Sequence, residues 1–251
     1  MLDKIKARGE KELKEWYDSF FSEHGTWPTT PKYNNTMLNY LEVPLNKNKK
    51  LLDVACGGGR LLEQAEKRVA SYGIDISRSA LKEAIERVKN SFLCMCSAEK
   101  LPFKEGTFDF ITCLGSLEHF LNMNIALREM KRVLKDDGLI NICVPNTYYI
   151  MNLLGVYKTG SDPNLEQINE RFATNAEWQK LLEDNGFEII KVYGVEPHPV
   201  KFKYIIWNLI KGNFADLTVH LIRKIHIPLN FAYCFSYIVK KRCVNDINQK
   251  S

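Results

Sequence analysis

Two aspartates and a run of glycines are the residues of this sequence best suited to bind a small molecule. Asp53 lies near the end of a short apolar run that predicts a buried strand, and glycines 57–59 follow it. Three consecutive glycines cost conformational entropy, so such a turn usually lets the backbone approach a ligand closely. Asp75 ends a second apolar run, 22 residues after Asp53, where a carboxylate can accept hydrogen bonds from ribose hydroxyls. A helix-capping aspartate is the alternative interpretation of Asp75.

The spacing of the glycines argues against two classes of nucleotide site. Counted from Gly57, the dinucleotide pattern G-x-G-x-x-G requires glycine at position 62, where Leu62 stands. No Gly-Lys-Ser/Thr follows the turn, so it is not the phosphate loop of an NTPase. The pattern Asp53-x-Ala55-x-Gly57-x-Gly59 fits an adenine nucleoside without a pyrophosphate. For the glycine cluster alone, an ordinary tight turn stays the alternative.

Alternating strands and helices must position these residues. Apolar runs predict strands at 51–54, 69–74, 91–96, 108–114, 139–144, 187–192 and 231–239, with helices between most of them. This alternation predicts an α/β fold with a doubly wound, mostly parallel sheet and right-handed crossovers. Before the first strand, apolar residues at helical spacing predict an amphipathic helix over 2–24 and a shorter one over 33–41.

Four segments, in order and at family spacing, resemble the motifs of class I S-adenosylmethionine-dependent methyltransferases. They are LLDVACGGG at 51–59, YGIDIS at 72–77, AEKLPF at 98–103 with FDFIT at 108–112, and MKRVLKDDGL at 130–139. The resemblance covers residues 48–146 and implies a Rossmann-like, seven-stranded sheet whose last strand is antiparallel and lies beside the fifth. It also implies S-adenosylmethionine as cofactor and S-adenosylhomocysteine as product.

The resemblance assigns roles to individual residues. The backbone of 55–59 lies near the methionine part of the cofactor, Asp75 binds the ribose, and Ile76 packs on the adenine. Ala55 replaces the usual first glycine, and Ser97 stands where an aspartate often accepts the adenine amino group. The implied cofactor-binding residues are Asp53, Ala55, Cys56, Gly57, Gly59, Asp75, Ile76, Ser97, Ala98, Glu99, Leu114 and Gly115.

Methyl transfer from a sulfonium is an in-line displacement, so alignment is the protein's main contribution, and a base is needed only for an acceptor that must lose a proton. His119 is the candidate base, because the ordinary pKa of histidine suits proton transfer near neutrality. A structural histidine is the alternative. The pair Glu118-His119 resembles ubiquinone-type O-methyltransferases, in which a preceding acid completes a metal site. Gly115 occupies that earlier position, so we predict no metal.

We predict an enzyme that transfers methyl groups to oxygen or nitrogen of a small-molecule acceptor. The residues proposed to contact the acceptor are Tyr17, Tyr33, Asn146, Tyr149 and Arg171. Two alternatives stay open, namely an RNA or protein methyltransferase and a non-catalytic S-adenosylmethionine-binding subunit. No nucleic-acid-binding module is recognisable, so we expect no nucleic-acid partner. The sequence leaves the oligomeric state open.

Charge and composition divide the chain further. The net charge is +5 over 251 residues, and residues 196–251 hold nine Lys or Arg against three acids. We expect a helical cap at 1–45, a cofactor-binding core at 46–195, a basic and apolar helical insertion at 196–230, and the final strand with a basic tail at 231–251. Peripheral membrane contact through 200–228 is an alternative to simple packing on the sheet. Because no apolar run approaches ~20 residues and the N-terminus lacks a signal-peptide core, we expect a cytoplasmic protein.

Overall fold

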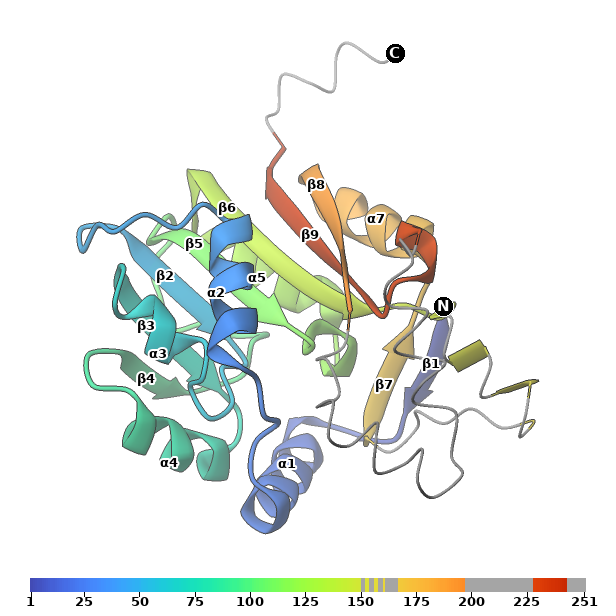
Figure 1. The fold of residues 1–251 in the computed structure, drawn as a ribbon. Helices are drawn as coiled ribbons and strands as arrows, with labels where there is room; N and C mark the ends of the chain where they lie inside the picture. The colour runs from blue at the N-terminus through green and yellow to red at the C-terminus, as the bar shows by residue number, and fades with distance from the viewer. Residues whose placement is uncertain (150–151, 154–155, 158–159, 161–166, 197–227, 243–251) are drawn as a thin grey trace, which may run out of the picture.

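The fold is given by a computed structural model, which describes all residues except 150–151, 154–155, 158–159, 161–166, 197–227 and 243–251 (Figure 1). Its centre is a seven-stranded sheet with the strand order β4-β3-β2-β5-β6-β9-β8. The strands are β2 (Lys50–Val54), β3 (Ala70–Asp75), β4 (Phe92–Met95), β5 (Phe108–Leu114), β6 (Leu134–Pro145), β8 (Phe187–Val195) and β9 (Cys234–Lys241). Strand β9 is antiparallel to both of its neighbours, β6 and β8. The predicted doubly wound sheet with an antiparallel last strand is therefore confirmed.

Helices cover both faces of the sheet, which makes three layers (Figure 1). On one face lie α2 (Pro31–Tyr40), α3 (Leu62–Ala65) and α4 (Arg78–Arg87), and on the other α5 (Met123–Val133) and α7 (Asn175–Asp184). Apolar side chains fix each layer: Met37 and Leu38 of α2 pack on Leu51, while Met130 and Trp178 belong to the larger cluster on the opposite face.

Side-chain caps set the starts of α4 and α7. The Ser77 hydroxyl accepts a hydrogen bond from the Ala80 N–H at the start of α4. Thr174 and Glu177 form a reciprocal capping box at the start of α7. Such caps satisfy N–H groups that the helix itself leaves unpaired, typically contributing about 1 kcal/mol each.

The first residues of the chain differ from the prediction. Residues 2–24 are not one helix, because β1 (Leu2–Ile5) pairs antiparallel with β7 (Asn169–Phe172), and α1 begins at Glu10 and ends at His24. The physical reason is a ladder of backbone hydrogen bonds to a segment more than 160 residues away, which a local apolar pattern does not report. Figure 1 shows the result: α1 lies below the sheet, near the ends of β2 and β3.

Other predicted regions are only partly described. Residues 197–227 of the predicted insertion and 243–251 of the predicted tail lie outside the described residues. The boundaries proposed for the cap, core, insertion and tail therefore stay predictions. In the part of the chain that is described, no helix has the length and apolar character needed to cross a membrane.

Candidate active site

One cavity of about 430 Å³ opens at the carboxyl ends of β2, β3 and β5. The strand order reverses here: β3 and β4 follow β2 on one side, and β5 and β6 lie on the other. Ligands of doubly wound folds bind at this kind of reversal, and the volume lies in the range of small-molecule pockets, roughly 300–1,000 Å³. The sheet topology therefore places the candidate site where a nucleoside would bind.

Most of the residues predicted for the site line this cavity. They are Tyr17, Tyr33, Asp53, Ala55, Cys56, Gly57, Asp75, Ile76, Ser97, Ala98, Glu99, Leu114, Gly115 and His119. Four others, Gly59, Asn146, Tyr149 and Arg171, are not among its lining residues. The side-chain amide of Asn146 instead donates to the carbonyls of Asn230 and Ala232, and Tyr149 packs edge-on against Tyr233.

The glycine turn is fastened to the end of β3 by Asp75. One carboxylate oxygen of Asp75 accepts from the Gly57 N–H at 2.8 Å, and the other accepts from the Ser77 N–H at 2.9 Å. Ala55 lies in the left-handed region with φ 59°, a conformation that costs an L-residue roughly 1–2 kcal/mol. Glycine, the residue the family usually has at this position, avoids that cost.

Two buried carboxyls, Asp53 and Asp75, form part of the cavity wall beside the glycine turn. Burial raises the pKa of Asp53 to about 7, although the Thr112 hydroxyl donates to it at 2.6 Å. Burial likewise raises the pKa of Asp75 to about 6, opposed by the backbone N–H groups that donate to it. Buried carboxyls of this kind favour a ligand that brings positive charge or hydroxyl donors.

Another part of the cavity wall is formed by η1 (Leu117–His119), which follows β5. His119 Nδ1 lies 2.6 Å from the carbonyl oxygen of Asn169. A carbonyl can only accept, so Nδ1 carries the proton and Nε2 keeps a free lone pair. Burial lowers the pKa of His119 to about 4, so the ring is neutral at pH 7. The sequence-based argument from an ordinary histidine pKa is therefore wrong for this position.

Glu118 is the group in the cavity that sequence reasoning did not assign. Its Oε1 lies 3.7 Å from His119 Nε2, and its Oε2 is buried without a hydrogen-bond partner. Burial raises the pKa of this carboxyl to about 8. Cys143, Tyr233 and Cys234 also line the cavity, and they come from β6 and from the chain at the start of β9. No local sequence pattern brings such distant residues to one site.

The buried guanidinium of Arg171 on β7, which does not line the cavity, holds η1 in place. Its Nη1 donates to the carbonyls of Glu118 and Phe120 at 3.1 and 2.5 Å, and its Nη2 donates to the carbonyl of Leu121 at 3.2 Å. Arg171 is only 4% exposed. Its predicted contact with the acceptor is therefore replaced by a structural one, the positioning of Glu118 and His119.

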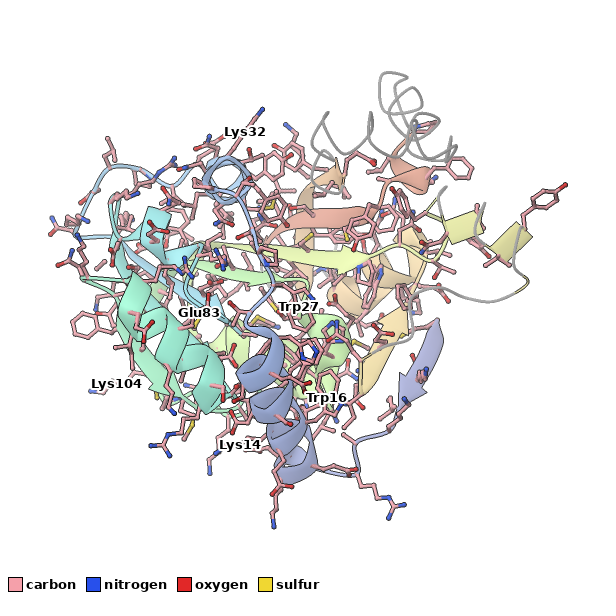
Figure 2. The ribbon with its side chains drawn as sticks, turned by 60° about the horizontal axis from the view of Figure 1, so that its bottom comes forward. Lys14, Trp16, Trp27, Lys32, Glu83 and Lys104 are labelled. Atoms are coloured by element: carbon pink, nitrogen blue, oxygen red, sulfur yellow. The ribbon has the colours of Figure 1, made fainter. Side chains whose placement is uncertain are left out.

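The segment after α1 covers the cavity and is linked to the glycine turn. The Thr26 hydroxyl donates to Glu83 Oε2 at 2.6 Å, and Arg87 Nη2 donates to Glu83 Oε1 at 2.5 Å. Arg87 Nε also donates to the carbonyl of Gly58 at 2.7 Å. Figure 2 shows Trp27 next to α1 and Glu83 on the neighbouring α4. Hydrogen bonds thus link the covering segment, α4 and the glycine turn in series.

The buried carboxyls predict how stability depends on pH. Between their ordinary pKa and their raised pKa, folded Asp53 and Glu118 keep protons that the unfolded chain has released. The free energy of unfolding of the ligand-free protein therefore falls as pH rises, by about 2 kcal/mol between pH 6.5 and 8. Below pH 6.5 the lowered pKa of His119 acts in the opposite direction. Urea unfolding at pH 6.5, 7.2 and 8 checks this, and a midpoint that stays constant or rises contradicts it.

Comparisons with known proteins agree with this fold and site. A family model described as a methyltransferase domain matches residues 52–142. The chain is 27% identical over 238 residues to an uncharacterized protein of Methanocaldococcus jannaschii, covering 87% of this chain and 93% of that one. It is 27% identical over 222 residues to the ubiquinone biosynthesis O-methyltransferase of Glaesserella parasuis, covering 82% and 92%.

Among solved structures, the chain resembles phosphoethanolamine N-methyltransferase 2 of Haemonchus contortus, in complex with S-adenosyl-L-methionine. The TM-score is 0.58 at 16% identity, over 93% of this chain and 57% of that one. Fold, site and family model together define a methyltransferase. The chain is a class I S-adenosylmethionine-dependent methyltransferase, as the ordered motifs predicted.

The residues present in the cavity fit S-adenosylmethionine as the cofactor. The cofactor carries a sulfonium and an ammonium group, and the buried carboxyls of Asp53 and Asp75 suit a cationic ligand. Both oxygens of Asp75 already accept one backbone N–H, and each retains a lone pair for a ribose hydroxyl. Gly57 in the left-handed region keeps the turn free of a side chain beside the cavity.

Proposed function

We propose that this enzyme transfers a methyl group from S-adenosylmethionine to the nitrogen or oxygen of a small molecule. One observation supports this above all: a single cavity is lined both by the glycine turn with Asp75 and by Glu118 with His119. A cofactor and an acceptor can therefore meet within one cavity. The printed name of the Glaesserella parasuis relative, an O-methyltransferase of ubiquinone biosynthesis, is also that of an enzyme with a small-molecule acceptor.

The roles proposed for the chain's own residues follow from where they lie. Asp75 holds the ribose, Asp53 faces the positively charged methionine part, and Ile76 packs on the adenine. When bound, S-adenosylmethionine supplies an activated methyl group. The protein contributes by aligning the acceptor atom with that group and by excluding water beneath α1. His119 orients the acceptor through the free lone pair on Nε2.

Calorimetry with S-adenosylmethionine tests the proposal. We expect one binding site per chain, and we expect S-adenosylhomocysteine to compete for it. Absence of binding at millimolar cofactor would remove the proposal. Methyl transfer from labelled cofactor is then measured with small amines and phenols, with RNA and with protein. Labelling of RNA or protein alone contradicts a small-molecule acceptor, and binding without any transfer indicates a non-catalytic subunit.

A further inference from the structure

One oxygen of the Glu118 carboxyl is left unsatisfied in the folded protein. The residue is 5% exposed and lines the cavity, and its Oε2 is buried with no hydrogen-bond partner. An unsatisfied buried acceptor costs free energy. A ligand group that donates a hydrogen bond to Oε2 removes this cost, so the geometry favours an acceptor that presents an N–H or O–H group here.

The charges around the Glu118 carboxyl favour a nitrogen acceptor of the methyl group over an oxygen acceptor. Arg60 is the one Lys or Arg among the described residues that line the cavity, and its guanidinium pairs with Glu83 at 3.2 Å. Arg171 lies behind Glu118, and its Nη1 and Nη2 donate to backbone carbonyls. The titratable groups that interact with Glu118 or contact it, besides Arg171, are Tyr17 of α1, Cys113 of β5, His119 of η1, Glu170 of β7, Tyr233 and Cys234.

This environment suits a cation and disfavours an oxyanion. A phenol that loses its proton here would leave a phenolate beside the Glu118 carboxyl, with Asp53 and Asp75 in the same cavity. An ammonium ion would instead be attracted by the same carboxyls. The rings of Tyr17, Tyr33 and Tyr233, which line the cavity, suit an amine attached to an aromatic or apolar body.

We infer that the methyl acceptor is an amine and that Glu118 binds its N–H group and takes its proton. This inference rests on the proposed function and narrows it to N-methylation. An ammonium held at Glu118 favours the ionised form of this carboxyl, and the carboxylate then takes one proton from the ammonium. The nitrogen lone pair then forms the new N–C bond while the C–S bond breaks and its electron pair passes to sulfur. The product leaves as a methylated ammonium, and the proton on Glu118 returns to solvent.

Glu118 fits the role of proton acceptor better than His119 does. Burial raises the pKa of Glu118 to about 8 and lowers that of His119 to about 4. The difference makes the carboxylate the far stronger base of the two. Nδ1 of His119 is held by the carbonyl of Asn169, so the ring orients the amine through Nε2. Glu118 is then the catalytic residue and His119 a positioning residue.

The test compares matched ligands on the full-length enzyme saturated with S-adenosylhomocysteine. Benzylamine and benzyl alcohol have nearly the same shape, as do tyramine and tyrosol, in which a hydroxyl replaces the amine. We expect each amine to bind at least tenfold more tightly than its partner, as measured by calorimetry at pH 7.5. We expect Glu118→Gln to abolish that preference and leave the Kd for S-adenosylhomocysteine within twofold.

A matched control distinguishes the effect of the cavity carboxyl on amine preference from the effect of any buried carboxyl. Glu170→Gln removes a neighbouring buried carboxyl that does not line the cavity, and we expect the preference for amines to persist. Glu118→Gln is nearly isosteric, and we expect its urea midpoint at pH 8 to rise, which shows that the variant is folded.

Activity gives the second measurement. With labelled S-adenosylmethionine, we expect Glu118→Gln to lower kcat/KM for an amine at least 100-fold. We also expect the variant to lose the rise of kcat with pH that ionisation of Glu118 causes. Equal binding of amines and alcohols, methylation of phenols in preference to amines, or an amine preference that survives Glu118→Gln overturns the inference. Failure to bind S-adenosylhomocysteine at all instead overturns the proposed function.

Discussion

Replacing Asp75 by alanine is expected to weaken the binding of S-adenosylmethionine at least tenfold, which is about 1.4 kcal/mol. The carboxylate is the proposed acceptor for the ribose hydroxyls, and it also accepts the N–H groups of Gly57 and Ser77. The variant therefore loses the sugar contact and the link that shapes the glycine turn. Calorimetry gives the Kd, and urea unfolding shows whether the turn loss also destabilises the fold.

Two further variants make the Asp75 result specific. Asp75→Asn keeps the shape and one acceptor oxygen, so its Kd should lie between those of the wild type and Asp75→Ala. Asp184 at the end of α7 is an exposed carboxylate paired with Lys180, and Asp184→Ala should leave the Kd unchanged. If Asp75→Ala bound the cofactor as tightly as the wild type, the ribose assignment would be wrong.

Replacing Arg171 by leucine is expected to lower the free energy of unfolding by about 3–5 kcal/mol. The substitution leaves the carbonyls of Glu118, Phe120 and Leu121 without their charged donor, and a buried unsatisfied group costs about 1–3 kcal/mol. Because these carbonyls belong to η1 and the residues after it, kcat should fall as well. The unfolding midpoint in urea and the slope of the transition measure the loss.

A lysine at the same position gives an intermediate case. The ammonium of Arg171→Lys keeps the charge but not the planar fork that reaches carbonyls on either side, so about half of the loss should remain. Arg128 is an exposed arginine of α5, and Arg128→Leu should change stability by less than about 0.5 kcal/mol. A loss below 1 kcal/mol for Arg171→Leu would show that water or other donors satisfy the three carbonyls.

The sheet and the cofactor end of the site follow from local sequence patterns. Strand β5 has the predicted bounds, the Ser77 cap starts α4, and Asp75 lies hydrogen-bonded to the glycine turn. Each of these depends on residues close together in the sequence, or on parallel strands whose carboxyl ends must share an edge. The resemblance to class I methyltransferases covers the same stretch of chain.

The acceptor end could not be predicted in the same way. The pairing of β1 with β7 joins residues far apart in the sequence, and it places Arg171 behind η1 instead of in the cavity. The pKa of His119 depends on burial by elements that lie on both sides of it in the chain. Glu118 is visible in the sequence, but its missing hydrogen-bond partner is a property of the packed cavity.

The hydrogen-bonded link from Thr26 through Glu83 and Arg87 to Gly58 has a kinetic consequence. Glu83 and Arg87 link the segment after α1, which covers the cavity, to the glycine turn beside the proposed nucleoside. A movement of either one therefore strains the hydrogen bonds to the other. Exchange of S-adenosylhomocysteine for S-adenosylmethionine and opening of the covering segment then become a single event. Turnover in such an enzyme is paced by that event when the chemical step is faster.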